Sequence, residues 1–177
     1  KRRGALSNLS HIPYIVNSRQ SSDLLKNLLT NDLPIIMEGM HSTFLIGHKS
    51  LEDRCIIYRE SNIEHEYYNY LSKAEKSLFK KLYFIVESFR LKRYEKVMNL
   101  ADQIWAVSKE DKKALEGRLG HKKVYFLPSF KGFDDVKSVE GSGEYVLYHA
   151  NLSVPENDKA AHYLIDNVFS KIKTSAI

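Results

Sequence analysis

The amino-acid sequence predicts an α/β fold built around a mainly parallel sheet. Short apolar runs rich in Ile, Val and Tyr alternate along the chain with segments of helical periodicity. Strands that alternate with helices in this way normally pair in parallel. The composition is that of a folded chain, because 43% of the 177 residues are hydrophobic and 28% are charged.

The first half of the chain contains three expected strands and two helical segments. Apolar runs predict strands at Ile12–Val16, Leu33–Gly39 and Arg54–Arg59, each too short for a core helix. The leucine spacing of Ser21–Leu29 predicts a helix between the first two strands. A longer helical pattern covers Glu64–Leu100, so we expect one long helix there, or two separated by a bend.

The middle of the chain predicts a strand–helix–strand unit. Ile104–Val107 is an apolar run, and Ser108 follows it three residues before Asp111. We interpret this capping-box-like pair as the start of a helix, which is expected to stop at Gly120. The next apolar run, Val124–Leu127, then forms another strand.

The sequence changes character after this unit. Ser129–Glu144 contains three glycines and little periodicity, so we interpret it as an interdomain linker. Tyr145–His149 then predicts a further strand, and Glu156–Ile172 predicts a further helix.

Charge and cysteine content narrow the function classes. A net charge of +5 suits contact with phosphates, nucleotides, anionic lipids or nucleic acid. The single cysteine, Cys55, excludes an internal disulfide framework and a cysteine-based zinc site, and it fits a cytoplasmic protein. The sequence lacks a phosphate-binding loop, a dinucleotide fingerprint and an HExxH motif, and its histidines are scattered, so we expect no metal site.

Four polar clusters follow expected strands, at the edge where parallel sheets bind ligands. They are Glu38–His41, Arg59–Glu64, Ser108–Asp111 and His149–Asn157. We interpret Ser108–Asp111 as a helix cap. The other three clusters are candidate ligand sites, although Glu38 and His41 could equally be satisfied loop residues.

The long helical segment carries a basic surface. Its cations are Lys73, Lys76, Lys80, Lys81, Arg90, Lys92, Arg93 and Lys96. Such a face is usually a solvated surface, and association with a membrane is the main functional alternative.

The order of the motifs resembles a known family. The runs RESNIEHEYYNYL, ADQIWAVSKEDKKAL, VYFLPSF and EYVLYHANLSVPENDKAAHYLI are similar to the retaining glycosyltransferases of family 4, which have the GT-B fold. The similarity covers nearly the whole chain. It implies an incomplete Rossmann-like, acceptor-side domain over residues 1–138. Residues 139–177 would then be a linker and the first strand–helix unit of a second, donor-binding Rossmann-like domain.

The resemblance implies a hexosyltransferase-type enzyme of polysaccharide biosynthesis. Such an enzyme transfers a sugar, with retention, from a nucleotide sugar to a glycan or lipid-linked acceptor. Because the family's opening strand and most of its donor domain have no counterpart here, the resemblance implies an inactive internal fragment. No cofactor and no metal are implied, since the nucleotide sugar is a co-substrate. The expected location is the cytoplasm, with peripheral contact at the inner face of the membrane through the basic helix of residues 73–96.

The resemblance assigns roles to the cluster after the third expected strand. Arg59, Asn62 and Glu64 match the family pattern as substrate-binding residues. Arg59 is expected to pair with Glu64 or to contact a ligand anion. Ser61 occupies the position of a frequent catalytic histidine of the family, and a serine cannot supply a cationic imidazolium.

The remaining assigned residues lie in two other clusters. His41 matches a cleft-facing position and is a catalytic candidate, and Glu38 is a substrate-binding candidate. His149, Ala150 and Asn151 match the donor-binding turn. Ala150 stands where the family usually has a glycine, which allows backbone N–H groups to approach the diphosphate.

The resemblance further implies that Arg59–Glu64 and His149–Asn151 line opposite walls of one crevice. The alternative from a different class is a non-catalytic basic α/β module that binds nucleic acid or a membrane surface. Because the aromatic residues fall mostly at core spacings and no recognised nucleic-acid motif is present, we expect no nucleic-acid partner.

Overall fold

The computed structural model describes residues 11–120, 123–130 and 145–172, together with residues 132, 135, 137, 140, 141 and 143. Its contacts divide the chain into two units, Lys1–Lys131 and Gly132–Ile177, and each is described here by itself. The boundary between residues 138 and 139 that the sequence predicts falls outside the described residues.

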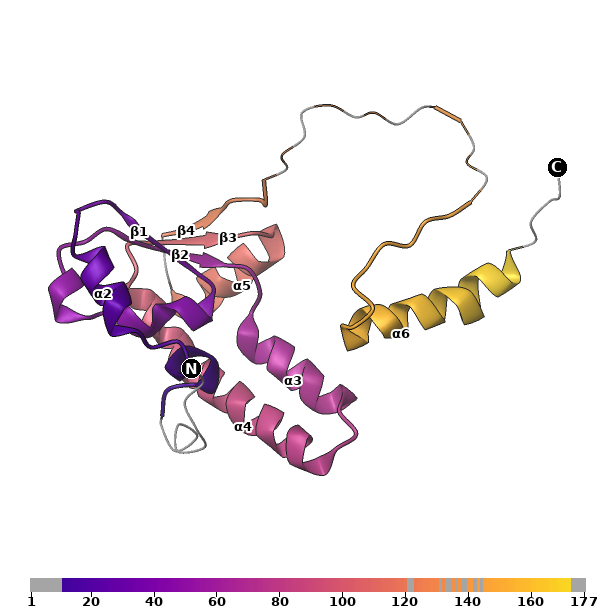
Figure 1. The fold of residues 1–177 in the computed structure, drawn as a ribbon, viewed down its shortest axis with the longest axis horizontal. Coiled ribbons are helices and arrows are strands. Elements are labelled where there is room, and N and C mark those ends of the chain that lie inside the picture. The colour runs from indigo at the N-terminus through magenta and orange to yellow at the C-terminus, as the bar shows by residue number, and fades with distance from the viewer. Residues whose placement is uncertain are drawn as a thin grey trace. The chain divides into compact units, whose positions relative to one another are not determined.

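The first unit contains the parallel sheet that the sequence predicts. Its four strands are β1 (Ile35–Glu38), β2 (Ile56–Glu60), β3 (Gln103–Ala106) and β4 (Val124–Phe126), hydrogen-bonded in the order β1-β2-β3-β4 (Figure 1). Every neighbouring pair is parallel. The unit is therefore α/β, with a Rossmann-like parallel sheet flanked by helices.

Helices connect the strands and precede them. They are α1 (Tyr14–Asn17), α2 (Ser22–Leu28), α3 (Glu64–Ala74), α4 (Leu78–Tyr94) and α5 (Lys109–Leu119), with the 3₁₀ segments η2 (Met40–Leu45), η3 (Lys49–Leu51) and η4 (Glu95–Leu100). The expected bounds of α5 are confirmed: the Ser108 hydroxyl accepts from the Asp111 N–H, and Gly120 ends the helix in the left-handed conformation.

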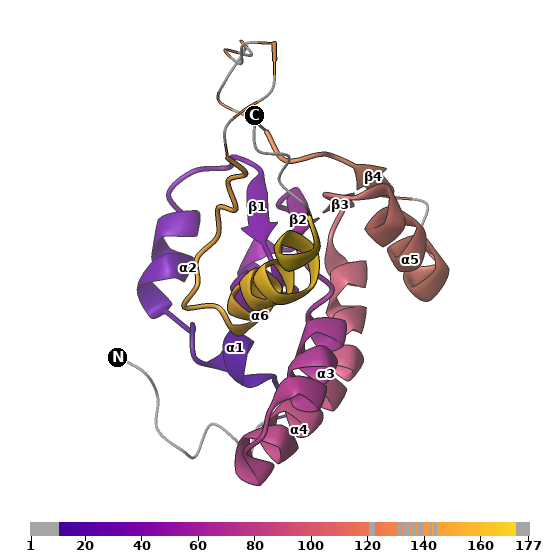
Figure 2. The same cartoon turned by 90° about the vertical axis from the view of Figure 1, so that its right-hand side faces the viewer.

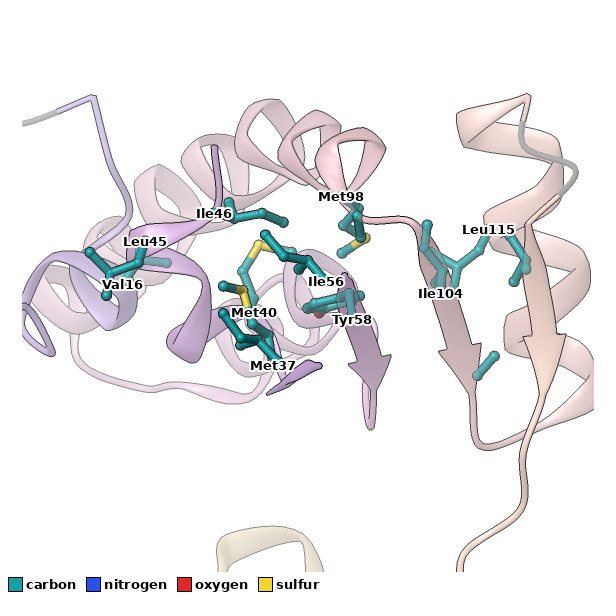
Figure 3. Close-up of a cluster of buried hydrophobic side chains, with 14 of the residues drawn as sticks. Val16, Met37, Met40, Leu45, Ile46, Ile56, Tyr58, Met98, Ile104 and Leu115 are labelled. Atoms are coloured by element: carbon teal, nitrogen blue, oxygen red, sulfur yellow. The ribbon is translucent and has the colours of Figure 1, made fainter. Parts of the chain in front are cut away.

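The two faces of the sheet differ in burial. In the register of the strands, Met37, Tyr58 and Ile104 lie on one face, and all three belong to the main hydrophobic core. Further strand residues and the connecting segments complete this core, the latter with Met40 and Met98 among others (Figure 3). The opposite face carries residues such as Ile36 and Tyr125, which are about half exposed.

The long helical pattern after β2 forms a helical hairpin. The helix breaks at Glu75–Ser77, and α3 and α4 then lie side by side (Figures 1 and 2). Tyr68 of α3 and Phe84 of α4 make an edge-to-face ring contact with centroids 5.8 Å apart. The Ser88 hydroxyl also donates to the His65 carbonyl at 2.8 Å. The structure therefore contains two helices separated by a bend, which is the second of the two alternatives that the sequence predicts.

The strand predicted at Ile12–Val16 is wrong, because this segment forms the short helix α1. Pro13 precedes the helix with φ of −54°, which is compatible with a helix start. The carboxylate of Glu87, on α4, accepts a hydrogen bond of 2.7 Å from the Tyr14 N–H. That contact satisfies a backbone donor that the first turn of a helix leaves free.

Within its described residues, the second unit contains one helical segment. It begins as α6 (Pro155–Tyr163), passes through a π-helical turn at Leu164–Val168, and ends in the 3₁₀ turn Phe169–Lys171. This agrees with the predicted helix. The strand predicted at Tyr145–His149 is not formed. A strand exists only through pairing, and no described segment pairs with this one, so most of its side chains stay exposed.

Among the described residues, no helix is both long enough and apolar enough to cross a lipid bilayer.

Candidate functional site

The carboxyl ends of β1 and β2 bring two of the predicted clusters together. Glu38 and Arg59 are register partners on the two strands, and the Gly39 N–H donates to the Arg59 carbonyl at 2.8 Å. The Arg59 guanidinium forms an ion pair with the Glu38 carboxylate. The sequence predicts that Arg59 pairs with Glu64 or contacts a ligand anion. In the structure its ion pair is with Glu38 instead of Glu64.

A glycine shapes the turn that follows β1. Gly39 has φ of +69°, a conformation that other residues rarely adopt. A Cβ placed there would lie 3.1 Å from two ring atoms of His41 and 3.8 Å from the Ser61 hydroxyl. The absence of a side chain thus lets His41 and Ser61, from different clusters, approach the same turn.

His41 is held largely in its neutral form near pH 7. Burial lowers the pKa of its imidazole, and the nearby charge of Arg19 lowers it further, while Glu38 acts in the opposite direction. His41 also lines a cavity of about 210 Å³, together with Arg19, Ser42 and Phe44. A neutral imidazole at such a place can accept a hydrogen bond or a proton.

Arg19 is a site residue that the sequence analysis missed. It lies just beyond α1, where its guanidinium donates to the Ile15 carbonyl at 2.8 Å. Its charge acts on both His41 and Glu64. Because Ile12–Val16 was interpreted as a strand, nothing in the sequence placed this arginine at the carboxyl edge of the sheet.

Glu64 is the first residue of α3 and is half-buried. Burial raises the pKa of its carboxyl group, and Arg19 opposes that shift. Asn62, two residues earlier, is exposed, so its amide is accessible at the same edge. The predicted group Arg59, Ser61, Asn62 and Glu64 therefore surrounds one end of the sheet.

A second residue missed from the sequence is Glu60, the last residue of β2. It is buried, and burial raises the pKa of its carboxyl group to about 8, so it is mostly protonated at neutral pH. The Tyr58 hydroxyl donates to its Oε2 at 2.9 Å, while its Oε1 has no hydrogen-bond partner among the described residues. The alternation Ile56, Tyr58, Glu60 was a signal in the sequence, since every second residue of a strand shares a face.

A groove of about 250 Å³ opens along the helical hairpin. Its walls include His65, Asn69, Ser88 and Lys92. Burial lowers the pKa of His65 despite the charge of the neighbouring Glu95, whose carboxylate lies 3.8 Å from Nδ1. This groove belongs to the hairpin, and the sequence analysis did not predict it.

The donor-binding candidates lie in the second unit and form a local turn. The Asn151 side-chain oxygen accepts from the N–H and the hydroxyl of Ser153, at 3.0 and 2.7 Å. The Asn157 amide donates to the Asn151 carbonyl at 3.1 Å. These bonds lead the chain from Ala150 into α6, which makes Asn151 a turn-forming residue, while His149 is exposed.

The arrangement offers cations, a neutral imidazole and hydroxyl or amide groups at one sheet edge, a set suited to polar or anionic ligands. Within the described part of the chain, no three His, Cys, Asp or Glu side chains are grouped closely enough to hold a metal ion. Comparison of the chain with protein-family models, with curated proteins and with solved structures gave no match.

Proposed function

We propose that the chain is part of a retaining glycosyltransferase of the GT-B class, and that its first unit carries the acceptor-side wall of the active site. The observation that carries this proposal is the meeting of His41 and Ser61 around Gly39 at the carboxyl edge of a parallel sheet. Ligands of open parallel sheets bind at this edge. The order of the family-like motifs along the chain supports the same conclusion.

In this proposal each residue at the carboxyl edge of the sheet has a role that follows from its charge. His41, kept neutral, accepts a hydrogen bond from an acceptor hydroxyl. Arg19 provides the positive charge that a sugar-phosphate donor or a phosphorylated acceptor requires, and Arg59, whose charge is paired with Glu38, adds guanidinium N–H donors. The Ser61 hydroxyl both donates and accepts, and so binds a sugar hydroxyl without contributing charge.

Unit Gly132–Ile177 supplies the start of the donor-binding domain in the same proposal. The N-terminus of α6, which follows the turn around Asn151, places the positive end of a helix dipole where it stabilises the charge that develops on a nucleoside-diphosphate leaving group. In this proposal the 177-residue chain alone is expected to bind acceptor sugars without transferring donor sugar.

The test is ligand-observed saturation-transfer NMR on the 177-residue chain. The probes are methyl glycosides of common hexoses and hexose-1-phosphates. At least one probe should give a transfer signal, and the signal should fall at least about fivefold in the variants His41→Ala and Arg59→Ala, because each removes a polar contact of about 1–2 kcal/mol.

Two substitutions serve as controls. His162→Ala removes an exposed histidine of α6, and Lys113→Ala removes an exposed cation of α5, and neither should change the signal. Absence of binding by every probe, or equal loss in the control variants, would refute an acceptor site at the edge of the sheet.

A further inference from the structure

The outward face of α4 carries a row of apolar side chains. Leu78, Leu82, Ile85 and Phe89 follow one another at intervals of four, three and four residues, so they share one side of the helix. Phe79 and Val86 extend the same surface. The exposed fractions of these six residues lie between 38% and 89%. We call this surface the α4 apolar stripe.

The stripe is a property of the folded hairpin. Glu87 and Leu91 are fully buried, and they occupy the side of α4 that faces the rest of the unit. The contacts with α3 fix that side. The leucines and phenylalanines of α4, which would normally pack into a core, therefore face outward here.

The charge around the stripe is strongly positive. The exposed cations of the hairpin and of η4 are Lys73, Lys76, Lys80, Lys81, Lys92, Arg93 and Lys96. Within residues 78–100 the only acidic residues are Glu87 and Glu95, and both are buried. The solvent-facing charge of α4 and η4 is consequently all of one sign.

We propose that the α3–α4 hairpin docks the protein onto an anionic membrane surface, with the α4 apolar stripe inserted at the boundary between headgroups and acyl chains. An amphipathic helix that combines apolar side chains with lysines and arginines binds lipid in two ways. Its apolar side chains are buried among the acyl chains, and its cations are attracted to anionic headgroups. A helix of 17 residues is about 25 Å long. Lying flat, it offers a linear contact to a planar surface.

The hairpin is placed to make this contact without disturbing the rest of the unit. It extends away from the strands in both views (Figures 1 and 2). The cavity that contains His41 and Arg19 is lined by residues of α2, of η2 and of the loop between α1 and α2, and by none of the hairpin. Membrane docking is therefore independent of sugar transfer, and either proposal can fail without the other.

The experiment is co-sedimentation of the 177-residue chain with large unilamellar vesicles. One set of vesicles is phosphatidylcholine alone, and the other is phosphatidylcholine mixed with phosphatidylglycerol. The chain should bind the anionic vesicles at least about tenfold more tightly than the neutral ones, and added salt should weaken the binding.

Two double variants separate the apolar and the electrostatic contributions. Leu82→Ser with Phe89→Ser removes the centre of the stripe, and Lys76→Glu with Lys81→Glu reverses two charges beside it. Each should reduce binding to anionic vesicles at least about tenfold. All four side chains are exposed, so circular dichroism and the unfolding midpoint should match those of the unchanged chain.

The matched controls carry the same changes elsewhere. Leu29→Ser with Leu33→Ser removes two exposed leucines beside α2, and Lys49→Glu with Lys113→Glu reverses two exposed charges of η3 and α5. These variants should bind vesicles as the unchanged chain does.

Three results would overturn the proposal. The first is binding that the stripe variants leave unchanged, and the second is no binding to anionic vesicles. The third is self-association in analytical ultracentrifugation that Leu82→Ser with Phe89→Ser abolishes while no lipid is bound, because the stripe would then be an interface between two copies of the chain.

Discussion

Tyr58 and Glu60 lie two residues apart on the same buried face of β2, and the phenol of one donates a hydrogen bond of 2.9 Å to the carboxyl group of the other. The protonated carboxyl group is a neutral end to an otherwise apolar strand face. Burial of an ionised carboxylate at this place would be costly, which is why the pKa of Glu60 is raised to about 8.

Stability should therefore fall as pH rises above the ordinary range of a glutamate. In the unfolded chain Glu60 ionises near its usual pKa of 4.5, whereas in the folded chain it ionises near 8. The stability that this group contributes is present below pH 4.5 and is lost as pH rises through 8, at most at about 1.4 kcal/mol per pH unit. Urea unfolding of Glu60→Gln should show a flatter pH profile than the unchanged chain between pH 5 and pH 9. The exposed control Glu52→Gln should keep the original slope, and an unaltered slope in Glu60→Gln would contradict the assignment.

Glu87 should be important for the docking of α1. Its buried carboxylate accepts from the Tyr14 N–H and from the Arg90 guanidinium, both at 2.7 Å. Replacement by alanine leaves the first of these donors without an acceptor in a buried place, at a cost of about 2–4 kcal/mol. We expect a lower unfolding midpoint and faster proteolysis before α2. Glu52→Ala, which removes an exposed carboxylate beside η3, should change neither measurement.

The cap of α5 provides a matched pair of serines. Ser108 and Ser77 each precede a helix, but only the Ser108 hydroxyl accepts a backbone hydrogen bond, at 2.9 Å from the Asp111 N–H. Ser108→Ala should cost about 1 kcal/mol of folding free energy in urea unfolding, and Ser108→Asp should retain most of it. Ser77→Ala should be nearly neutral. Equal effects of the two alanine variants would show that the capping bond does not stabilise the fold.

Gly39 should matter to the site as well as to the backbone. Gly39→Ala and Gly120→Ala both place a Cβ at a positive φ, near +69° and +62°, and each should cost about 1–2 kcal/mol. Only the first places that atom 3.1 Å from the ring of His41. The pKa of His41, measured by NMR titration, should therefore lie below the ordinary value of 6.5 in the unchanged chain. Of the two variants, only Gly39→Ala should shift this pKa. A shift of the same size in Gly120→Ala would argue against direct contact.

Local pattern was sufficient to predict the sheet and most of its helices. The runs around Ile35–Glu38 and Ile56–Glu60 are short and β-branched, and the stops at Gly120 and Pro128 are local signals. The run Ile12–Val16 has similar composition, but it contains a proline, and its Tyr14 N–H donates to the carboxylate of Glu87, which lies far along the chain. No window of a few residues contains that information.

Pairing in space explains the other differences. The ion pair between Glu38 and Arg59 depends on the register of β1 against β2, which the sequence does not specify. The place of Arg19 depends on how α1 packs. The helical pattern of Leu78–Phe89 correctly predicted a helix but not the side that would be buried, because Glu87 and Leu91 pack inward instead. The crevice predicted between Arg59–Glu64 and His149–Asn151 stays a prediction.

The helical hairpin has a consequence for the order of folding. β2 and β3 are neighbours in the sheet, yet the whole of α3 and α4 lies between them along the chain. Contacts within the hairpin join residues close in sequence, whereas the β2–β3 ladder must close a long loop first. The hairpin is thus expected to appear early during refolding and to bring the two strands within reach, so that substitutions between α3 and α4 slow refolding more than substitutions at the β3–β4 edge.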